Sequence, residues 1–182
     1  NRASGKTGRA VARACYVRGA DVTLVHDGGD VHYADVERVE SAAEMLEAVE
    51  AHADDADALI SAAAISDYTV DAAGEKIKSG TDRLTLELTP TPKLIDTVRE
   101  AHPDLSIVGF KVETEGDEAT LIERARETME RAGLAFVVGN RADVMGEAET
   151  QALVIREDGS DEYAGSKAGL GARVAEELAA EL

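Results

Sequence analysis

The chain has 182 residues, which fits one domain over 1–182 with a core large enough to need no disulfide or metal. Its formal net charge is −18, from 37 acidic and 19 basic residues, which argues against a nucleic acid or an anionic membrane as partner. Two Phe and no Trp also argue against the aromatic stacking surfaces of single-strand nucleic-acid binders.

The composition also predicts where the protein works. An acidic chain with few lysines is what a salt-rich cytoplasm favours, because salt screens its self-repulsion, so we expect a halophilic source. The one cysteine, Cys15, lies in an apolar helical pattern, which predicts a small buried residue in a reducing compartment rather than a nucleophile. No run of about 20 apolar residues occurs. We therefore expect a cytoplasmic protein.

Helices and strands alternate along the chain. Ser4, Ser41 and Ser166 are expected N-caps, and Pro92 suits the first turn of a helix. The patterns predict helices over 4–18, 41–52, 116–132 and 166–182, with one more beginning within 90–95. They predict strands over 21–26, 35–39, 58–60, 83–88, 104–110, 134–138, 151–156 and 161–164.

This alternation predicts an α/β fold with a mostly parallel sheet, helices on both faces and an antiparallel C-terminal hairpin. The segment 83–88 alternates strictly and is expected to be a half-buried strand. A glycine-rich turn and a helix open the chain with no strand ahead of them. Nucleotide-binding folds normally place a strand there, so an N-terminal strand is apparently missing.

The stretch 61–79 has the composition of a ligand-binding edge. Small residues follow a buried strand, then come Asp67, Tyr68 and a loop that carries Lys76 and Lys78. In open α/β sheets, ligands bind beyond the carboxyl ends of the strands. The two lysines are either phosphate contacts or plain solvated charges.

The segment from Ser4 to Gly8 predicts a second anion site, because a helix start offers free N–H groups beside Lys6. A P-loop needs a first glycine five residues before the Gly5-Lys6 pair, and the chain does not extend that far back. A capped helix without a ligand is the alternative.

Two further patterns carry weaker signals. Tyr163 and Lys167 match the Tyr-x-x-x-Lys pair of short-chain dehydrogenases, but Gly165 and the expected helix start at Ser166 interrupt the spacing. The four histidines are scattered without metal-ligand spacing, so no protein metal site is predicted.

Six motifs in order together resemble one family. They are Asn-x-x-Ser-Gly-Lys-x-Gly, Ala-Ala-Ile-Ser-Asp-Tyr, Glu-Lys-Ile-Lys-Ser, Pro-Thr-Pro-Lys-Leu-Ile, Val-Gly-Phe-Lys-Val-Glu-Thr and Val-Val-Gly-Asn, beginning at 1, 63, 75, 90, 108 and 137. Together they resemble phosphopantothenate–cysteine ligase, also called phosphopantothenoylcysteine synthetase. This is usually the C-terminal half of a bifunctional protein of coenzyme A biosynthesis, and the resemblance spans nearly the whole chain.

The resemblance implies a Rossmann-like fold, a homodimer and a two-step reaction. The family activates 4′-phosphopantothenate with CTP and Mg²⁺, releases pyrophosphate, and lets L-cysteine displace CMP from the acyl-cytidylate. A decarboxylase half, the part that would bind FMN, is absent from this chain, as are the family's first strand and the Gly-Thr-rich loop before Asn1.

The resemblance also assigns site residues. Asn1 and Lys76 are implied to be catalytic, and Ser4, Gly5, Lys6 and Lys78 are expected to bind the substrate and its phosphate. Nucleotide contacts are implied for Ser61, Ala62, Ala63, Asp67, Lys76, Pro92, Lys93, Leu94, Ile95 and Phe110. Two basic nucleotide contacts on the 116–132 helix have Arg126 and Arg131 as candidates, although the spacing differs there. Lys111 and Arg141 depart from many bacterial relatives, which have a small residue and Asp.

Two rival functions remain open on the sequence alone. One is a nicotinamide- or flavin-dependent oxidoreductase, based on the α/β pattern, on Asp27 after a strand and on the Tyr163/Lys167 pair. The other is a non-catalytic nucleotide-binding or dimerisation module.

Overall fold

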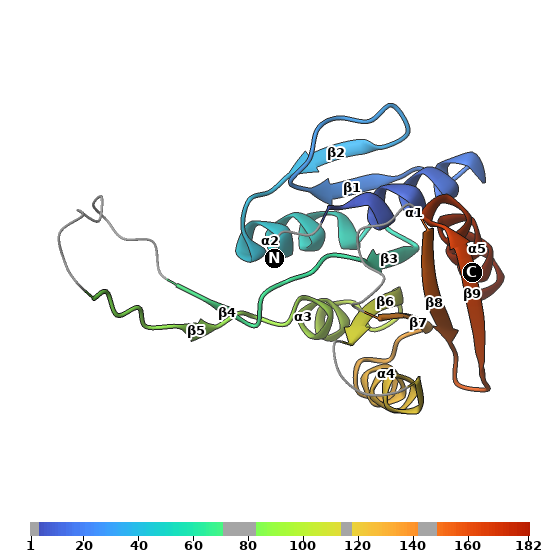
Figure 1. Ribbon diagram of the computed structural model, residues 1–182. Coiled ribbons are helices and arrows are strands. Elements are labelled where there is room, and N and C mark those ends of the chain that lie inside the picture. The colour runs from blue at the N-terminus through green and yellow to red at the C-terminus, as the bar shows by residue number, and fades with distance from the viewer. Residues whose placement is uncertain (1–3, 71–82, 114–117, 142–148) are drawn as a thin grey trace.

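A five-stranded mixed sheet forms the centre of the protein in the computed structural model, which describes residues 4–70, 83–113, 118–141 and 149–182 (Figure 1). The strand order is β3-β6-β7-β8-β9. The first three strands are parallel, and β8 and β9 are antiparallel. Their bounds are β3 Ala58–Ser61, β6 Ser106–Glu113, β7 Phe136–Arg141, β8 Glu149–Ile155 and β9 Ser160–Ser166. The predicted α/β class, its parallel strands and its C-terminal hairpin are therefore confirmed.

Alternating side chains of the central strands form two cores, one on each face of the sheet. In β6, Ile107 packs into one core and Val108 into the other, and in β7 Phe136 and Val137 divide in the same way. All four are at most 1% exposed. Because strand side chains alternate in direction, helices must cover both faces.

Helices cover both faces as the pattern predicts. The first core packs against α2 (Ala42–Ala53), α3 (Leu94–Ala101) and α4 (Glu118–Ala132), and the second against α1 (Lys6–Val17) and α5 (Lys167–Glu181). Helix α5 lies directly on the backbone of α1, since a Cβ at Gly171 would meet the Ala10 carbonyl. A side chain at Gly171 would push the two helices apart.

Two of the three predicted serine caps are confirmed. Ser41 and Glu44 form a reciprocal capping box at α2, and the Ser166 hydroxyl accepts from the Gly169 amide at α5. The prediction for Ser4 is wrong, because Gly5 is the N-cap of α1, with φ of 63° and no side-chain cap.

Two small sheets flank the central one. Strands β1 (Thr23–His26) and β2 (Asp35–Arg38) form a separate parallel pair. Strands β4 (Tyr68–Thr69) and β5 (Thr89–Pro90) form an antiparallel pair at the base of an arm that projects from the body (Figure 1). No helix in the described ranges has the length and apolar character that a membrane span requires.

The prediction for 83–88 is wrong in its pairing and its burial. These residues are neither paired in a sheet nor covered, and Leu84, Leu86 and Leu88 are 57%, 56% and 56% exposed on the arm. The helix expected within 90–95 begins at Leu94, so Pro92 lies just before its N-cap, Lys93, and not in its first turn.

Candidate functional site

The start of α1 lies against the carboxyl end of β3. A Cβ placed at Gly8 would stand 3.8 Å from the Cβ of Ala62, one residue beyond the strand. Ser61 and Ala62 are partly buried and Ala63 is exposed. The small side chains would let a ligand approach the backbone of this strand end, and nucleotide binding here stays a prediction.

An ion pair joins two segments of this edge that are far apart in sequence. Lys93 Nζ donates to the Asp67 carboxylate, and the Thr91 amide donates to the Asp67 carbonyl at 2.9 Å. Lys93, by hydrogen bond and charge, lowers the pKa of the Asp67 carboxyl below its usual range. Both side chains are exposed, so the pair stands open to a ligand.

Three polar atoms without a hydrogen-bond partner among the described residues lie at or near the ends of strands. In the described part of the chain, three enclosed side-chain atoms lack a hydrogen-bond partner: Thr91 Oγ1, Asn140 Oδ1 and His26 Nε2. Thr91 follows β5, Asn140 is the next-to-last residue of β7, and His26 is the last residue of β1. Buried polar groups are normally paired, so an unpaired one calls for an explanation such as a ligand.

The Pro92–Ile95 segment contributes in two different ways. Pro92 and Lys93 are exposed, whereas Leu94 is 6% exposed and belongs to the core, with Ile95 packed against it. Leu94 and Ile95 can therefore contact a ligand only through their backbone atoms. Phe110 of β6 is partly buried and packs on the opposite face of the sheet, against the core beneath α1 and α5.

Part of the predicted site lies outside the described residues. Asn1, Lys76 and Lys78 belong to this part, so their roles stay predictions. Ser4, Gly5 and Lys6 are all exposed at the start of α1.

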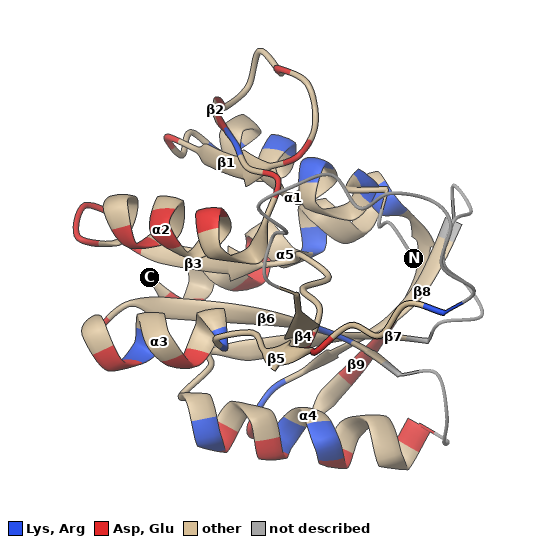
Figure 2. Ribbon diagram, turned by 90° about the vertical axis from the view of Figure 1, so that its left-hand side faces the viewer, with Lys and Arg blue, Asp and Glu red and all other residues tan. Residues whose placement is uncertain are grey.

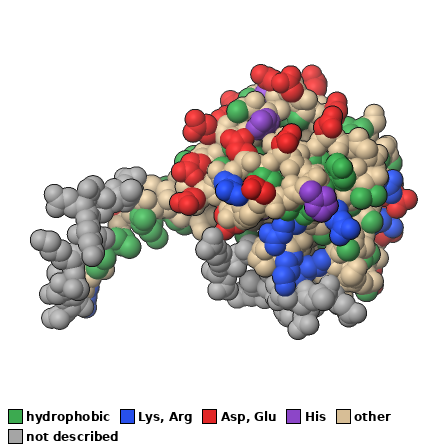
Figure 3. All heavy atoms as spheres, turned by 90° about the horizontal axis from the view of Figure 1, so that it is seen from above, with side chains coloured by type: hydrophobic (Ala, Val, Ile, Leu, Met, Phe, Trp, Pro, Cys, Tyr) green, Lys and Arg blue, Asp and Glu red, His purple; other side chains and the backbone are tan. Residues whose placement is uncertain are grey.

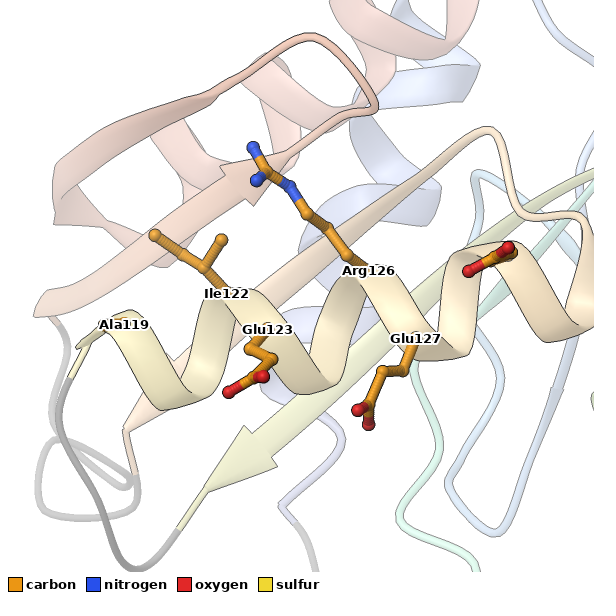
Figure 4. A pocket seen from close by; sticks show the side chains of 6 residues that line it. Ala119, Ile122, Glu123, Arg126 and Glu127 are labelled. Atoms are coloured by element: carbon orange, nitrogen blue, oxygen red, sulfur yellow. The ribbon is translucent and has the colours of Figure 1, made fainter.

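The two arginine candidates on α4 have other surroundings. Arg131 pairs with Asp96 of α3. Arg126 is exposed on α4 and lines a shallow depression with Ala119 and Ile122, and in Figure 4 its side chain points the opposite way from Glu123 and Glu127. The same depression is lined by Glu123, Glu127 and Glu130. These carboxylates would repel a triphosphate near Arg126. The roles of both arginines as nucleotide contacts stay predictions.

The dehydrogenase-like pair does not form. Tyr163 is in β9 and donates its hydroxyl to the Ser166 carbonyl, whereas Lys167 begins α5. The two residues do not share a helix, which removes this support for an oxidoreductase. Cys15 is partly buried against the second core, as expected of a packing residue, and burial raises its pKa.

The described residues hold no group of three His, Cys, Asp or Glu side chains that could bind a metal. Asp67 is the one carboxylate between the end of β3 and the strand β4. Mg²⁺ commonly binds through one or two carboxylates plus substrate phosphates. The site therefore fits a metal that arrives on a nucleotide and does not fit an all-protein cage.

Sequence reasoning missed the importance of two residues here. Thr91 and Asn140 stand inside recognised motifs, but only the structure places their polar atoms in enclosed positions without a partner among the described residues.

Curated relatives match most of the chain. It is 43% identical over 166 residues to the coenzyme A biosynthesis bifunctional protein CoaBC of Thermococcus kodakarensis, covering 87% of this chain and 40% of that protein. It is 32% identical over 182 residues to CoaBC of Methanocaldococcus jannaschii, covering 98% of this chain and 45% of that protein. The chain thus spans less than half the length of these relatives.

Solved structures share the fold. The DNA/pantothenate metabolism flavoprotein of Streptococcus pneumoniae superposes with a TM-score of 0.87 at 19% identity, over 100% of this chain and 90% of that chain. The C-terminal domain of a CoaBC protein gives 0.78 at 25% identity, over 100% and 85%. A Cab2 mutant in complex with phosphopantothenate-cysteine gives 0.76 at 18% identity, over 100% and 80%.

The family model described as the DNA/pantothenate metabolism flavoprotein C-terminal domain matches residues 1–182. This match covers the whole sequence and agrees with the relatives and with the fold. The chain therefore belongs to the DNA/pantothenate metabolism flavoprotein C-terminal domain family.

Proposed function

We propose that this chain joins 4′-phosphopantothenate to L-cysteine in coenzyme A biosynthesis, using CTP and releasing CMP and pyrophosphate. The observation that carries the proposal is the meeting of three segments at one sheet edge: the start of α1, the end of β3 with Asp67, and the Thr91–Lys93 segment. Family membership supports it, as does the coenzyme A role in the relatives' names.

The proposed reaction has two displacements. The carboxylate of 4′-phosphopantothenate attacks the α-phosphorus of CTP, and pyrophosphate leaves. The amino group of cysteine then attacks the acyl carbon, and CMP leaves as the amide bond forms. Both steps concentrate negative charge on phosphoryl oxygens, which cations and oriented N–H groups stabilise. Lys76 and the start of α1 are assigned this work, and Asn1 is assigned to the second step.

The described residues bind and orient the nucleotide in this proposal. Ala62 and Ala63 let it approach the strand end closely, and the Asp67 carboxylate accepts hydrogen bonds from its hydroxyl groups. The unpaired Oγ1 of Thr91 and Oδ1 of Asn140 are the enclosed polar atoms that a base or ribose would satisfy. Mg²⁺, bound through the phosphates, would neutralise charge on the triphosphate.

We also propose that two copies of the chain form a dimer through the arm. Leu84, Leu86 and Leu88 recur at every second position, so in an extended segment they share one side, and all three are more than half exposed. Figure 3 shows hydrophobic side chains along the described part of this arm. An exposed apolar strand edge is a template for pairing, and a second copy brings the same edge.

The proposed setting is a cytoplasmic bifunctional protein. Because the chain spans less than half of its relatives, a flavin-dependent decarboxylase half, carrying the FMN, is the proposed covalent neighbour. No role for FMN is assigned to the residues of this chain.

The deciding experiment mixes the protein with CTP or ATP, Mg²⁺, 4′-phosphopantothenate and cysteine, in molar KCl and in dilute buffer. Pyrophosphate should appear with CTP, and more of it in KCl if the source is halophilic. Folded protein that binds CTP without releasing pyrophosphate would leave the nucleotide-binding module as the function. An absorbing bound nicotinamide or flavin would favour the oxidoreductase.

Substitution of Lys76 tests the assigned chemistry. Removing one preorganised partner of a developing charge typically costs about 10²–10³ in rate, so Lys76→Ala should slow acyl-cytidylate formation by that factor. Lys167→Ala is the matched control. This lysine begins α5 directly after β9, and β9 is the strand farthest from β3 in the sheet order. For Asn1→Asp, acyl-cytidylate should accumulate. Wild-type rates of intermediate formation in Lys76→Ala would refute its assignment.

The dimer has its own test. Light scattering should give twice the chain mass for the wild type and one chain mass when Leu84, Leu86 and Leu88 are all changed to Ser. Leu182→Ser is the control, since that leucine is 69% exposed at the other end of the chain. A wild type that is monomeric at high concentration would end the proposal.

A further inference from the structure

Helix α1 carries a row of positive charge in an otherwise acidic protein. Lys6, Arg9 and Arg13 follow one another at spacings of three and four, so they share one side of the helix. None of the three makes an ion pair with a described residue, unlike Arg18 at the end of the same helix, which pairs with Glu176. Figure 2 shows basic segments along α1 and acidic segments along α2, and Figure 3 shows basic side chains gathered on one part of the surface.

The Arg9 guanidinium lies between two glycines. Its Nη2 donates to the Ser4 carbonyl at 2.9 Å, which folds the side chain back toward the start of α1. A Cβ at Gly5, where φ is 63°, would stand 2.9 Å from Nη1, and a Cβ at Gly28 would stand 3.4 Å from the same atom. The absence of side chains at both positions leaves room for the Arg9 guanidinium, which packs against the two glycines.

Arg9 has donors to spare at this place. A guanidinium carries five N–H donors in a planar fork, and one is used on Ser4. Such a fork matches the oxygens of a phosphate in a way that a lysine does not. Lys6 and Arg13, before and after Arg9 on the helix, supply the remaining charge for a dianion.

His26 borders the same space from another element. It ends β1, and its Cε1 and Nδ1 would lie 2.6 and 2.8 Å from a Cβ at Gly28. Its Nε2 is enclosed and has no partner among the described residues. The site therefore draws on α1, on β1 and on the loop after β1, which is a built arrangement and more than the end of one helix.

The position of Arg9 separates this place from the nucleotide floor. Gly8, the preceding residue, faces Ala62 beyond β3, while Arg9 faces Gly28 beyond β1. The start of α1 therefore stands between two neighbouring sites. A substrate with a phosphate at one end and a reacting carboxylate at the other would span them.

We infer that Arg9, with Lys6, Arg13 and His26, binds a phosphomonoester dianion beside the nucleotide floor. Resting on the proposed function, this dianion is the 4′-phosphate of the acyl substrate and not the triphosphate of the nucleotide. Arg9 binds the phosphate, and the absence of side chains at Gly5 and Gly28 leaves room for its guanidinium.

Calorimetry on the whole chain tests this without turnover. The wild type should bind 4′-phosphopantothenate more tightly than pantothenate, and Arg9→Gln should lose about 10-fold or more of that preference, since a hydrogen bond to a charged group is worth about 1.5–3 kcal/mol. Affinity for CTP should stay within about twofold, because Arg9 faces away from the nucleotide floor. Arg18→Gln, on the same helix, is the matched control and should change neither.

Inorganic phosphate distinguishes the source of the dianion. It should compete with 4′-phosphopantothenate for the wild type and not for Arg9→Gln. Arg9→Lys, which keeps the charge without the fork, should fall between the two and guards against a folding defect in the glutamine variant. Gly28→Val, whose side chain would displace His26 and press on Arg9, should weaken the binding of 4′-phosphopantothenate and spare that of pantothenate.

Two results would overturn the inference. One is an unchanged preference for the phosphorylated substrate in Arg9→Gln. The other is an equal loss of CTP affinity, which would assign the guanidinium to the triphosphate. Failure of the ligase assay with an intact phosphate preference would count against the proposed function alone. An unchanged KM for 4′-phosphopantothenate in an active Arg9→Gln protein would count against this inference alone.

Discussion

Polar groups of the described residues are hydrogen-bonded differently at the two ends of the central strands: those at the beginning of the strands (the closed edge) are paired, and some at the carboxyl end (the open edge) are not. At the end where β6 and β7 begin, Arg99 of α3 donates to four carbonyls: Ala132 and Gly133 at the end of α4, and His102 and Pro103 after α3. At the other end of these strands, the enclosed Oδ1 of Asn140 in β7 has no partner among the described residues. The same holds for Thr91 Oγ1 and His26 Nε2, at the ends of strands in the two small sheets.

This difference separates stability from function. The carbonyls at a helix C-terminus need donors, and a cation there also interacts favourably with the helix dipole, so Arg99 joins the ends of two helices into one unit. Polar groups left unpaired on the other edge cost stability and persist where a ligand completes them. One edge should therefore respond to substitution through unfolding, and the other through binding.

The largest expected effect is on the closed edge. Arg99→Met should lower the free energy of unfolding by about 2–3 kcal/mol, because the carbonyls lose a charged donor while the apolar stem is kept. Urea unfolding in molar KCl would measure it. CTP binding by the folded fraction should not change.

The matched control for Arg99 is an arginine with an exposed partner. Arg38 pairs with Asp30 at 2.9 Å, and both side chains are more than half exposed. Arg38→Met should cost less than about 1 kcal/mol. If Arg99→Met costs no more than Arg38→Met, the contrast between the edges fails.

A smaller effect of opposite sign is expected on the open edge. Thr91→Val removes a hydroxyl that is enclosed without a partner, so the free energy of unfolding should rise by about 1 kcal/mol while CTP affinity falls. Thr97→Val is the control, since that hydroxyl donates to the Lys93 carbonyl at 3.1 Å and its loss should not stabilise. Destabilisation by Thr91→Val would mean that its hydroxyl is paired in solution.

The buried strand faces and the helix starts could be predicted from the sequence, because their signals lie in residues that are close together along the chain. The alternation through Ile107 and Val108 specifies two buried faces, and Ser41 with Glu44 specifies a helix start within four residues. The same reasoning failed for Leu84 and Leu86. Their alternation is as regular as that of a core strand, but whether a strand is paired and covered depends on distant segments.

The site was less predictable than the fold for the same reason. The motifs placed Asp67 and Lys93 in the site, yet their ion pair joins positions 26 residues apart and needs the fold to form. The orphaned hydroxyl of Thr91 is likewise a property of its surroundings. Ser4 had the right residue type for a cap, but the positive φ at Gly5 moves the helix start by one residue.

The smallest expected effect concerns the Asp67–Lys93 ion pair. Lys93 lowers the pKa of the Asp67 carboxyl, so Lys93→Met should raise that pKa toward its ordinary value of about 3.9. A lowered carboxyl pKa contributes stability above the unfolded pKa, and this contribution is lost as pH falls through the folded pKa. Both side chains are exposed, so the change in stability should be slight.

Carboxyl ¹³C NMR titration would measure the Asp67 pKa directly, with Asp158, an exposed carboxylate of the β8–β9 turn, as an internal reference. Because Asp67 is ionised at neutral pH with or without Lys93, the substitution frees the carboxylate without changing its charge. A rise in CTP affinity would then mean that the ion pair competes with the nucleotide for Asp67. A fall would mean that Lys93 itself binds phosphate, and an unmoved pKa would mean that the pair is not populated in solution. Substitution of Lys93 should therefore be detected as a change in CTP affinity, whereas substitution of Arg99 should be detected as a change in the free energy of unfolding.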